Sequence, residues 1–377
     1  MKRFYHSIFS CVCVLVWCAS GISLADSVTQ DSTIYSRQNA DSVDEDELLT
    51  VHFIDVGSGD AILINTPSDK KILIDGGWSW GDRGKAPREY LSYLDRFLGD
   101  DVVDLIIITH PDYDHFAGLH YVLDSYSVRQ IWYTGYDSND LSTSWNNLVD
   151  KIQEEEGLLY VSPIEDFLGL GSIIRFDNSE TYKESDDVVL TIINARRWLS
   201  DEAYGSRRYI GEARRRNSSS LVVKLDFGNT SFLFTGDTNG RKKWSDNEGE
   251  CEDQERFMVD NNKNPDNPLY GELNSTVLKV AHHGSDGSSS LPFLKAVKPE
   301  WAIISAGVHH DHPHSPVLER LSHQDVGLDD SLILRTDMDE DTHTSATEAN
   351  LGDDSYQFFV DPDGIVKIEK WNVRVED

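Results

Sequence analysis

The strongest constraint on this chain is a group of metal-binding residue types that follows a short apolar run. The run, residues 105–108, has the length and composition of a buried β-strand. His110, Asp112, Asp114 and His115 come directly after it. Alternate residues of an extended segment project to one side, so the first three side chains can converge at the strand end. Imidazole and carboxylate are the usual non-sulfur ligands of zinc. The spacing therefore predicts a metal site rather than a solvated polar loop.

Three further segments place similar residue types at the ends of predicted strands. The first ends in Gly-Asp at Asp237, whose carboxylate could bridge two metals. The second ends in the pair His282-His283, followed by Gly-Ser. The third precedes a His-rich stretch that includes His312, for which a fortuitous metal-binding tract is the alternative. Together with the first loop, these segments supply enough donors for two adjacent ions.

Strand-like and helix-like patterns alternate along the chain. Strands are predicted at residues 49–56, 61–64, 71–75, 105–108, 130–133, 188–194, 221–227, 231–235, 276–281, 301–305 and 331–335. Helices are predicted at residues 87–98, 116–124, 145–155 and 291–297. These are too many strands for one sheet, so we expect two sheets with helices outside. The polar, acidic segment 242–267 is predicted to be a long surface insertion.

The N-terminus has the three parts of a secretory signal. Lys2 and Arg3 precede an apolar stretch from about residue 8 to residue 24, and Ser-Leu-Ala ends it. We expect cleavage after Ala25 and export to the periplasm or the extracellular space. A membrane anchor is the alternative, but Ser and Gly interrupt the apolar stretch, which is short for a bilayer. Residues 26–48 are polar and acidic and are predicted to be a disordered leader, with one domain over 49–377.

The charge, the cysteine content and the hydropathy of the mature chain limit the nucleic-acid, disulfide and membrane interactions that we expect of it. Loss of residues 1–25 removes Lys2, Arg3 and no acid, so the formal charge of -32 becomes -34. Such a surface repels polyanions at long range, so we expect no stable nucleic-acid complex. Cys251 alone lies outside the predicted signal, so no internal disulfide is expected. No other apolar run approaches bilayer length, so no membrane span is expected in the mature chain.

Taken in order, these motifs resemble the metallo-β-lactamase superfamily, and within it the hydrolase domain of ComEC-type competence proteins. The matching segments are residues 53–61, 74–77, 110–115, Asn217 with 220–222, 235–237, 282–285 and 312–313. They span about residues 50 to 335. The resemblance implies an α/β fold, the αββα sandwich of two mixed sheets with helices outside. It also implies two divalent metal ions at the sheet edge, with zinc as the expected metal, which hold a water molecule as hydroxide for hydrolysis.

The resemblance further implies a role for each candidate residue. The first metal would be held by His110, Asp112 and His283, the second by Asp114, His115 and His312, with Asp237 bridging them. His282 would then serve proton transfer or contact the substrate oxyanion, which makes His282 and Asp237 the candidate catalytic residues. Which of the two adjacent histidines is the ligand stays open. Asp112 stands where the wider superfamily has a second histidine, and a carboxylate admits manganese or magnesium more readily than imidazole does.

A cluster of arginines precedes Asn217. Seven arginines and no lysine lie between residues 196 and 216, opposed by three acids. They are Arg196, Arg197, Arg207, Arg208, Arg214, Arg215 and Arg216. Guanidinium groups make forked contacts to phosphate or carboxylate, so Arg214, Arg215, Arg216 and Asn217 are predicted to bind the substrate. The alternative is a solvated loop whose arginines pair with the acidic insertion after Lys242.

These features predict a secreted, metal-dependent hydrolase that resembles a phosphodiesterase. Its substrate would be a small or polymeric anion, such as a phosphodiester or a nucleic acid. Three alternatives stay open. The first is a hydrolase of another small ester, either a phosphorylcholine ester or a lactone. The second is a β-lactamase, which the carboxylate at position 112 disfavours. The third is a non-catalytic, metal-stabilised interaction module, for which lost ligands would be the sign, and none is lost.

Overall fold

The computed structural model describes a large part of the chain, with gaps. The described residues are 27–38, 40, 48–77, 88–99, 102–136, 141–155, 158–161, 171–176, 187–195, 211–307, 309–338 and 354–374. The predicted signal lies outside them, as do Arg196, Arg197, Arg207 and Arg208. No helix in the described ranges is long and apolar enough to cross a bilayer.

The first sheet has nine strands within the described residues. Their order is β1-β16-β15-β2-β3-β4-β5-β6-β7. The bounds are β1 Ser27–Ser36, β2 Leu49–Phe53, β3 Ile62–Asn65, β4 Lys71–Ile74, β5 Leu105–Ile108, β6 Gln130–Tyr133, β7 Leu159–Val161, β15 Ser355–Asp361 and β16 Gly364–Arg374. Strands β4 to β7 are parallel, whereas β1 to β3, β15 and β16 pair antiparallel. The parallel strands therefore end at one edge.

The second sheet has seven strands within the same ranges, in the order β14-β13-β12-β11-β10-β9-β8. The bounds are β8 Ile173–Arg175, β9 Val189–Asn194, β10 Val222–Phe227, β11 Thr230–Phe234, β12 Val277–Lys279, β13 Trp301–Ile304 and β14 Ile333–Arg335. Strands β11 to β14 are parallel. Their carboxyl ends also meet at one edge.

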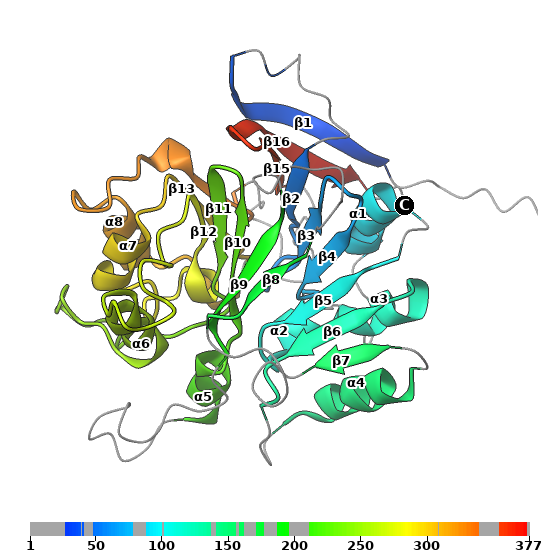
Figure 1. The fold of residues 1–377 in the computed structure, drawn as a ribbon, viewed down its shortest axis with the longest axis horizontal. Coiled ribbons are helices and arrows are strands. Elements are labelled where there is room, and N and C mark those ends of the chain that lie inside the picture. The colour runs from blue at the N-terminus through cyan, green and yellow to red at the C-terminus, as the bar shows by residue number, and fades with distance from the viewer. Residues whose placement is uncertain are drawn as a thin grey trace, which may run out of the picture.

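Three apolar layers hold the sheets and helices together. The layer between the sheets joins Leu49 and Phe53 of the first sheet to Leu190 and Phe232 of the second. Helices α1 (Arg88–Leu98), α3 (Leu119–Ser125) and α4 (Thr143–Glu154) cover the first sheet, and α6 (Asp253–Asn262), α7 (Leu291–Val297) and α8 (Ser315–Leu321) cover the second (Figure 1). The short helices are α2 (Tyr113–Phe116) and α5 (Glu212–Ser218). The predicted αββα sandwich is confirmed.

The prediction of a disordered leader is wrong for residues 27–36. They form β1, which pairs antiparallel with β16 from Ser27 opposite Arg374 to Ser36 opposite Lys367 (Figure 1). Most β1 side chains are exposed, because the strand lies at the edge of the sheet and is held by backbone hydrogen bonds. Such a strand has no apolar periodicity that a sequence pattern could reveal.

The acidic segment 242–267 is also more than a surface insertion. It contains α6, whose Met258 and Val259 are buried in the layer against the second sheet. Glu255 is fully buried, and its carboxylate accepts hydrogen bonds from the N–H groups of Ser289 and Ser290 at 2.6 and 2.8 Å. This helix therefore fixes the start of α7. A polar composition concealed it, because some of its acids are satisfied by buried backbone donors.

The edge position of β1 gives a stability prediction. A chain that begins at Arg37 should have a melting temperature at least about 5 °C below that of a chain that begins at Ser27, because β16 loses its antiparallel partner. It should also aggregate more readily, since the unpaired edge of β16 becomes accessible. Thermal unfolding followed by circular dichroism measures the difference. Equal melting temperatures would mean that β1 contributes nothing to the fold.

Candidate metal centre

The predicted metal ligands converge where parallel strands of both sheets end. His110, Asp112, Asp114 and His115 follow β5 of the first sheet, and Asp237 follows β11 of the second. The remaining three candidates follow the next two strands of the second sheet, and they are His282, His283 and His312. The N–H of Leu221 donates to the carbonyl of Thr109 at 2.8 Å, which ties the two sheets together at this edge.

Four of these side chains form a compact set of donor atoms. His115 Nε2, His283 Nε2 and Asp237 Oδ1 lie 3.3 Å from one another. Asp114 Oδ2 lies 3.5 Å from His283 Nε2 and 4.0 Å from His115 Nε2. Two ligands of a tetrahedral zinc, each about 2.1 Å from it, are about 3.4 Å apart. The four atoms therefore fit around one cation.

The second oxygen of Asp237 faces a looser set. Asp237 Oδ2 lies 3.9 Å from His110 Nε2 and 3.7 Å from His282 Nε2. Asp112 Oδ2 lies 3.8 Å from His110 Nε2. His110 Nε2 is buried and meets the geometry of no hydrogen bond with the described residues. Buried polar atoms of this kind need a partner, and a cation would supply it.

The electrostatics of the cluster also favour cations. Burial alone would lower the pKa of His283, but Asp237 and Asp114 outweigh it and raise the pKa to about 10. Burial likewise opposes charge on His115, whose pKa is raised well above its usual value by Asp237, Asp75 and Asp114. The carboxylates thus draw protons onto two imidazoles. A bound cation would displace those protons, as metal binding to histidine generally does.

Two hydrogen bonds fix the direction of the paired imidazoles. His115 Nδ1 lies 2.8 Å from Asp75 Oδ2, and His283 Nδ1 lies 2.8 Å from the carbonyl oxygen of Ser305. Contacts at Nδ1 hold a ligating imidazole with its Nε2 toward the metal. Sequence reasoning missed this role of Asp75, although the residue belongs to a motif that the resemblance includes. The sequence feature that could have indicated this role is an acidic residue at the end of the apolar strand β4.

A buried ion pair lies behind the same histidines. Asp60 Oδ1 is 3.5 Å from His283 Nδ1, and its other oxygen pairs with the ammonium of Lys279. Lys279 is 1% exposed and donates to the carbonyl of Gly236 at 3.3 Å. Sequence reasoning missed both residues. The sequence feature that could have indicated this ion pair is a lysine inside the apolar strand β12, because a charge there needs a buried partner.

A glycine brings the loop of Asp60 against the metal-binding loop. Gly59 has φ +113°, and a Cβ atom there would lie 1.9 Å from the carbonyl oxygen of Asp114. Any other residue would push the two loops apart. The loop after β2 therefore helps to set the position of Asp114.

The two adjacent histidines occupy a strained turn. His282 and His283 both have φ 53°, and Gly284 continues in the left-handed region with φ 79°. The N–H of His282 donates to the carbonyl of Gly236 at 3.0 Å, which anchors the turn beside Asp237. Left-handed backbone in non-glycine residues is costly and is concentrated at functional sites. The turn brings both imidazoles near one carboxylate.

This turn groups the histidines differently from the ligand sets that the resemblance implied. His283 was expected with His110 and Asp112, but it lies with Asp114 and His115. His282, expected to be free, lies on the side of His110. His312, expected in the second set, is buried beside both, with its ring centroid 5.7 Å from that of His282 and 6.3 Å from that of His283. The compact set takes its fourth donor from His283 instead.

An open cleft of about 570 Å³ gives access to the cluster. Its lining includes Asp112, Asp114, Ala213, Arg214, Asn217, Asp237, Asn239, Lys242, Lys243, His282, His283, Gly287, His310 and His312. Three basic residues of this lining, Arg214, Lys242 and Lys243, stand at the wall beside the acidic donor groups. The cleft can therefore receive an anion next to the metal-binding residues.

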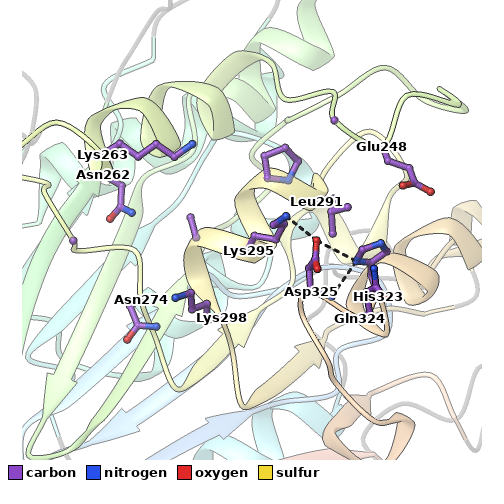
Figure 2. A pocket seen from close by; sticks show the side chains of 14 residues that line it. Glu248, Asn262, Lys263, Asn274, Leu291, Lys295, Lys298, His323, Gln324 and Asp325 are labelled. Carbon is purple, nitrogen blue, oxygen red and sulfur yellow. Dashed lines mark hydrogen bonds and ion pairs between the residues drawn. The ribbon is translucent and has the colours of Figure 1, made fainter.

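A larger cavity, about 880 Å³, lies elsewhere, and none of the candidate ligands lines it (Figure 2). Lys295 in its wall pairs with Asp325 at 2.7 Å (Figure 2). Lys298 is the C-terminal cap of α7, where a cation offsets the helix dipole. These lysines are explained by local structure.

The predicted substrate-binding arginines divide into different roles. Arg214 pairs with Asp253 at the start of α6, with Nε 2.7 Å from Oδ2. This contact matches the alternative in which the arginines pair with the acidic segment. Arg216 pairs with Asp112 through Oδ1, the oxygen other than the one near His110. Arg215 lies between them on α5 and is half-buried.

Asn217 lies on the same helix, α5. Its Nδ2 is 3.2 Å from His282 Nε2, and its side chain lines the cleft. Asn217 is 5% exposed, so its amide is a buried part of the wall of the site.

The whole arrangement matches a known family. The family model described as the metallo-beta-lactamase superfamily matches residues 54–309. The chain belongs to the metallo-β-lactamase superfamily. Members of this fold bind divalent metals, in agreement with the cluster of histidines and aspartates. The matched range contains every candidate ligand except His312.

Curated relatives identify the branch of the superfamily. ComE operon protein 3 of Bacillus subtilis is 27% identical over 300 residues, which cover 76% of this chain and 32% of that protein. Recombination protein 2 of Haemophilus influenzae is 28% identical over 273 residues, 72% of this chain and 26% of that protein. Competence protein ComA of Neisseria gonorrhoeae is 34% identical over 124 residues, 32% of this chain and 14% of that protein. The chain spans about a third or less of these relatives. The predicted resemblance to the competence-type branch is confirmed.

Arg214 and Arg216 of α5 pair with different acids, so substitutions at the two positions should have different effects. Arg216→Gln should weaken metal affinity about 10- to 100-fold, because Asp112 loses the group that orients it. Arg216→Lys should restore part of the loss. Arg214→Gln should leave metal affinity unchanged but lower the melting temperature by several degrees, because Asp253 loses its ion pair. Chelator competition and thermal unfolding separate the effects. If both glutamine variants changed metal affinity equally, these roles would be wrong.

Proposed function

We propose that this chain is an exported, metal-dependent phosphodiesterase that uses two divalent cations. The observation that carries the proposal is the placement of Asp237, which directs one oxygen toward each of two donor groups on the floor of an open cleft. A carboxylate in this position bridges two adjacent cations in dinuclear hydrolases. The export part of the proposal rests on the composition of residues 1–25.

The proposed ligands follow the distances. One cation would be held by Asp114, His115, His283 and Asp237 Oδ1, and the other by His110, Asp112, His282 and Asp237 Oδ2. The mixture of imidazole and carboxylate suits zinc, and three carboxylates in seven ligands also suit manganese. His312 stays at the cleft wall as an additional candidate on the side of His282.

The chain's own residues would prepare this site for hydrolysis. When bound, two divalent cations act as Lewis acids and lower the pKa of a water molecule. Asp75 and the carbonyl of Ser305 hold two imidazoles in their directions. Arg216 holds Asp112, and Asn217 contacts His282. The side chains therefore need little rearrangement when substrate binds, which favours catalysis.

The lining of the cleft favours an anionic substrate. Lys242 and Lys243 lie on its wall, and Arg214 also contributes to it. At physiological salt the Debye length is about 8 Å, so attraction at the mouth can act despite the formal charge of -32 on the whole chain. A phosphodiester uses both this attraction and two cations. A lactone or another neutral ester would gain nothing from the lysines.

A substrate panel tests this function. Protein reconstituted with zinc or with manganese should hydrolyse bis-p-nitrophenyl phosphate and single-stranded DNA faster than a phosphorylcholine ester, a lactone or nitrocefin. Asp237→Asn should lower kcat/KM for the phosphodiesters at least about 100-fold, because each cation loses a ligand. Asp260→Asn, which changes an exposed acid on α6, is the control. Preferred hydrolysis of the lactone or nitrocefin, or full activity of Asp237→Asn, would refute the proposal.

A further inference from the structure

Helix α5 contacts one donor group of the looser set from each sheet. Its Arg216 pairs with Asp112, which follows β5 of the first sheet. The next residue, Asn217, has its Nδ2 3.2 Å from Nε2 of His282, which follows β12 of the second sheet. The relative positions of these two donor groups therefore depend on where α5 lies.

The imidazoles of the compact set are held by other elements. His115 Nδ1 lies 2.8 Å from Asp75 Oδ2, which follows β4. His283 Nδ1 lies 2.8 Å from the carbonyl oxygen of Ser305, which follows β13. Both supports are buried at strand ends. A displacement of α5 would therefore disturb the looser set before the compact one.

Contacts with loops and helices of the second sheet hold one side of α5. Arg214 Nε donates to Asp253 Oδ2 of α6 at 2.7 Å. Asn239, which follows β11, donates through Nδ2 to the carbonyl of Arg214 at 3.3 Å. Gln254 of α6 donates to the carbonyl of Ser218, the last residue of α5. These bonds fix the helix to the second sheet, but they do not place it against the first.

Tyr136 supplies the contact with the first sheet. Its hydroxyl donates to Glu212 Oε1 in the first turn of α5. Tyr136 follows β6, which is parallel to β5 with Tyr133 opposite Ile108, so the loops after both strands leave the sheet at the same edge. The residue is 3% exposed, yet within the described residues its ring belongs to none of the apolar layers. Core packing alone therefore does not explain its position.

Glu212 connects this tyrosine to the arginine that holds Asp112. Glu212 and Arg216 are four residues apart on α5, a spacing that puts an acid and a base on the same face of a helix. Burial would lower the pKa of Arg216, but Asp112, Tyr136 and Glu212 outweigh it and raise the pKa. The phenol and the two carboxylates therefore all lie near one guanidinium group.

We propose that Tyr136 and Glu212 are positioning residues for the cation held by His110, Asp112 and His282. They hold the first turn of α5 against the first sheet, and α5 then brings the donor groups of the two sheets together. The inference rests on the two-cation site of the proposed function and assigns the two cations different supports. Residues that orient metal ligands from outside typically change metal affinity 10- to 100-fold.

The test is a zinc titration of metal-free protein against a chromophoric chelator, which gives a Kd for each of the two binding steps. Tyr136→Phe keeps the ring and removes the hydroxyl, so it should raise one Kd about tenfold and leave the other unchanged. Glu212→Ala should do the same, and Glu212→Gln, which keeps a hydrogen-bond acceptor, should restore most of the affinity. Tyr126→Phe is the matched control, because it removes a tyrosine–carboxylate bond to Asp95 on helix α1. It should change neither Kd.

Two further measurements separate positioning from a purely structural role. The weakened step should be the one that is lost in His110→Ala, which removes a donor of the looser set alone. The melting temperature of metal-free Tyr136→Phe should fall no further than that of Tyr126→Phe. Equal weakening of both steps, or weakening of the step that persists in His110→Ala, would overturn the inference. Unchanged Kd values in both Tyr136→Phe and Glu212→Ala would overturn it as well.

This inference and the proposed function can fail separately, because zinc binding is measured without substrate. If Tyr136→Phe weakens one zinc step and no phosphodiester is hydrolysed, the positioning role stands and the proposed activity is wrong. If phosphodiesters are hydrolysed and Tyr136→Phe leaves both zinc steps unchanged, the proposed activity stands and the positioning role is wrong.

Discussion

The structure depends on how buried carboxylates are compensated where its two sheets meet. Asp60, Asp75 and Asp237 are all nearly fully buried at this edge. An unpaired buried charge is costly, and each of them has a cationic or imidazole neighbour. Lys279 offsets Asp60, and His115 lies against Asp75 and Asp237. The excess of negative charge is what makes the edge a site for cations, because protons drawn onto histidines are readily exchanged for metals.

The fold serves this edge by aligning strand ends. In both sheets the parallel strands deliver their loops to the same place, so short loops with little freedom carry the donor atoms. The loops are further locked by the close approach of Gly59 to Asp114 and by the left-handed turn at His282 and His283. At the cleft wall, Arg216 pairs with Asp112 and so holds a candidate ligand by the same kind of ion pair.

The sequence predicted those features that depend on residue type and strand spacing. It predicted β5 at its observed bounds and placed the metal-competent residues at strand ends. It could not decide which of His282 and His283 is the metal ligand. The directions of the two side chains depend on a turn of positive φ, which no periodicity reveals. It missed β1, which is held by backbone hydrogen bonds. It grouped Arg214 with Arg216, although residues two apart on a helix point in different directions and meet different acids.

A crystal structure of protein reconstituted with zinc, with anomalous scattering recorded at the zinc edge, tests directly whether Asp237 lies between two cations. We expect two peaks about 3.5 to 4 Å apart, one on each side of the Asp237 carboxylate. One peak would lie among Asp114, His115 and His283, and the other beside His110 and His282. No peak at this edge of the sheets, or a single peak that Asp237 does not contact, would contradict the central claim.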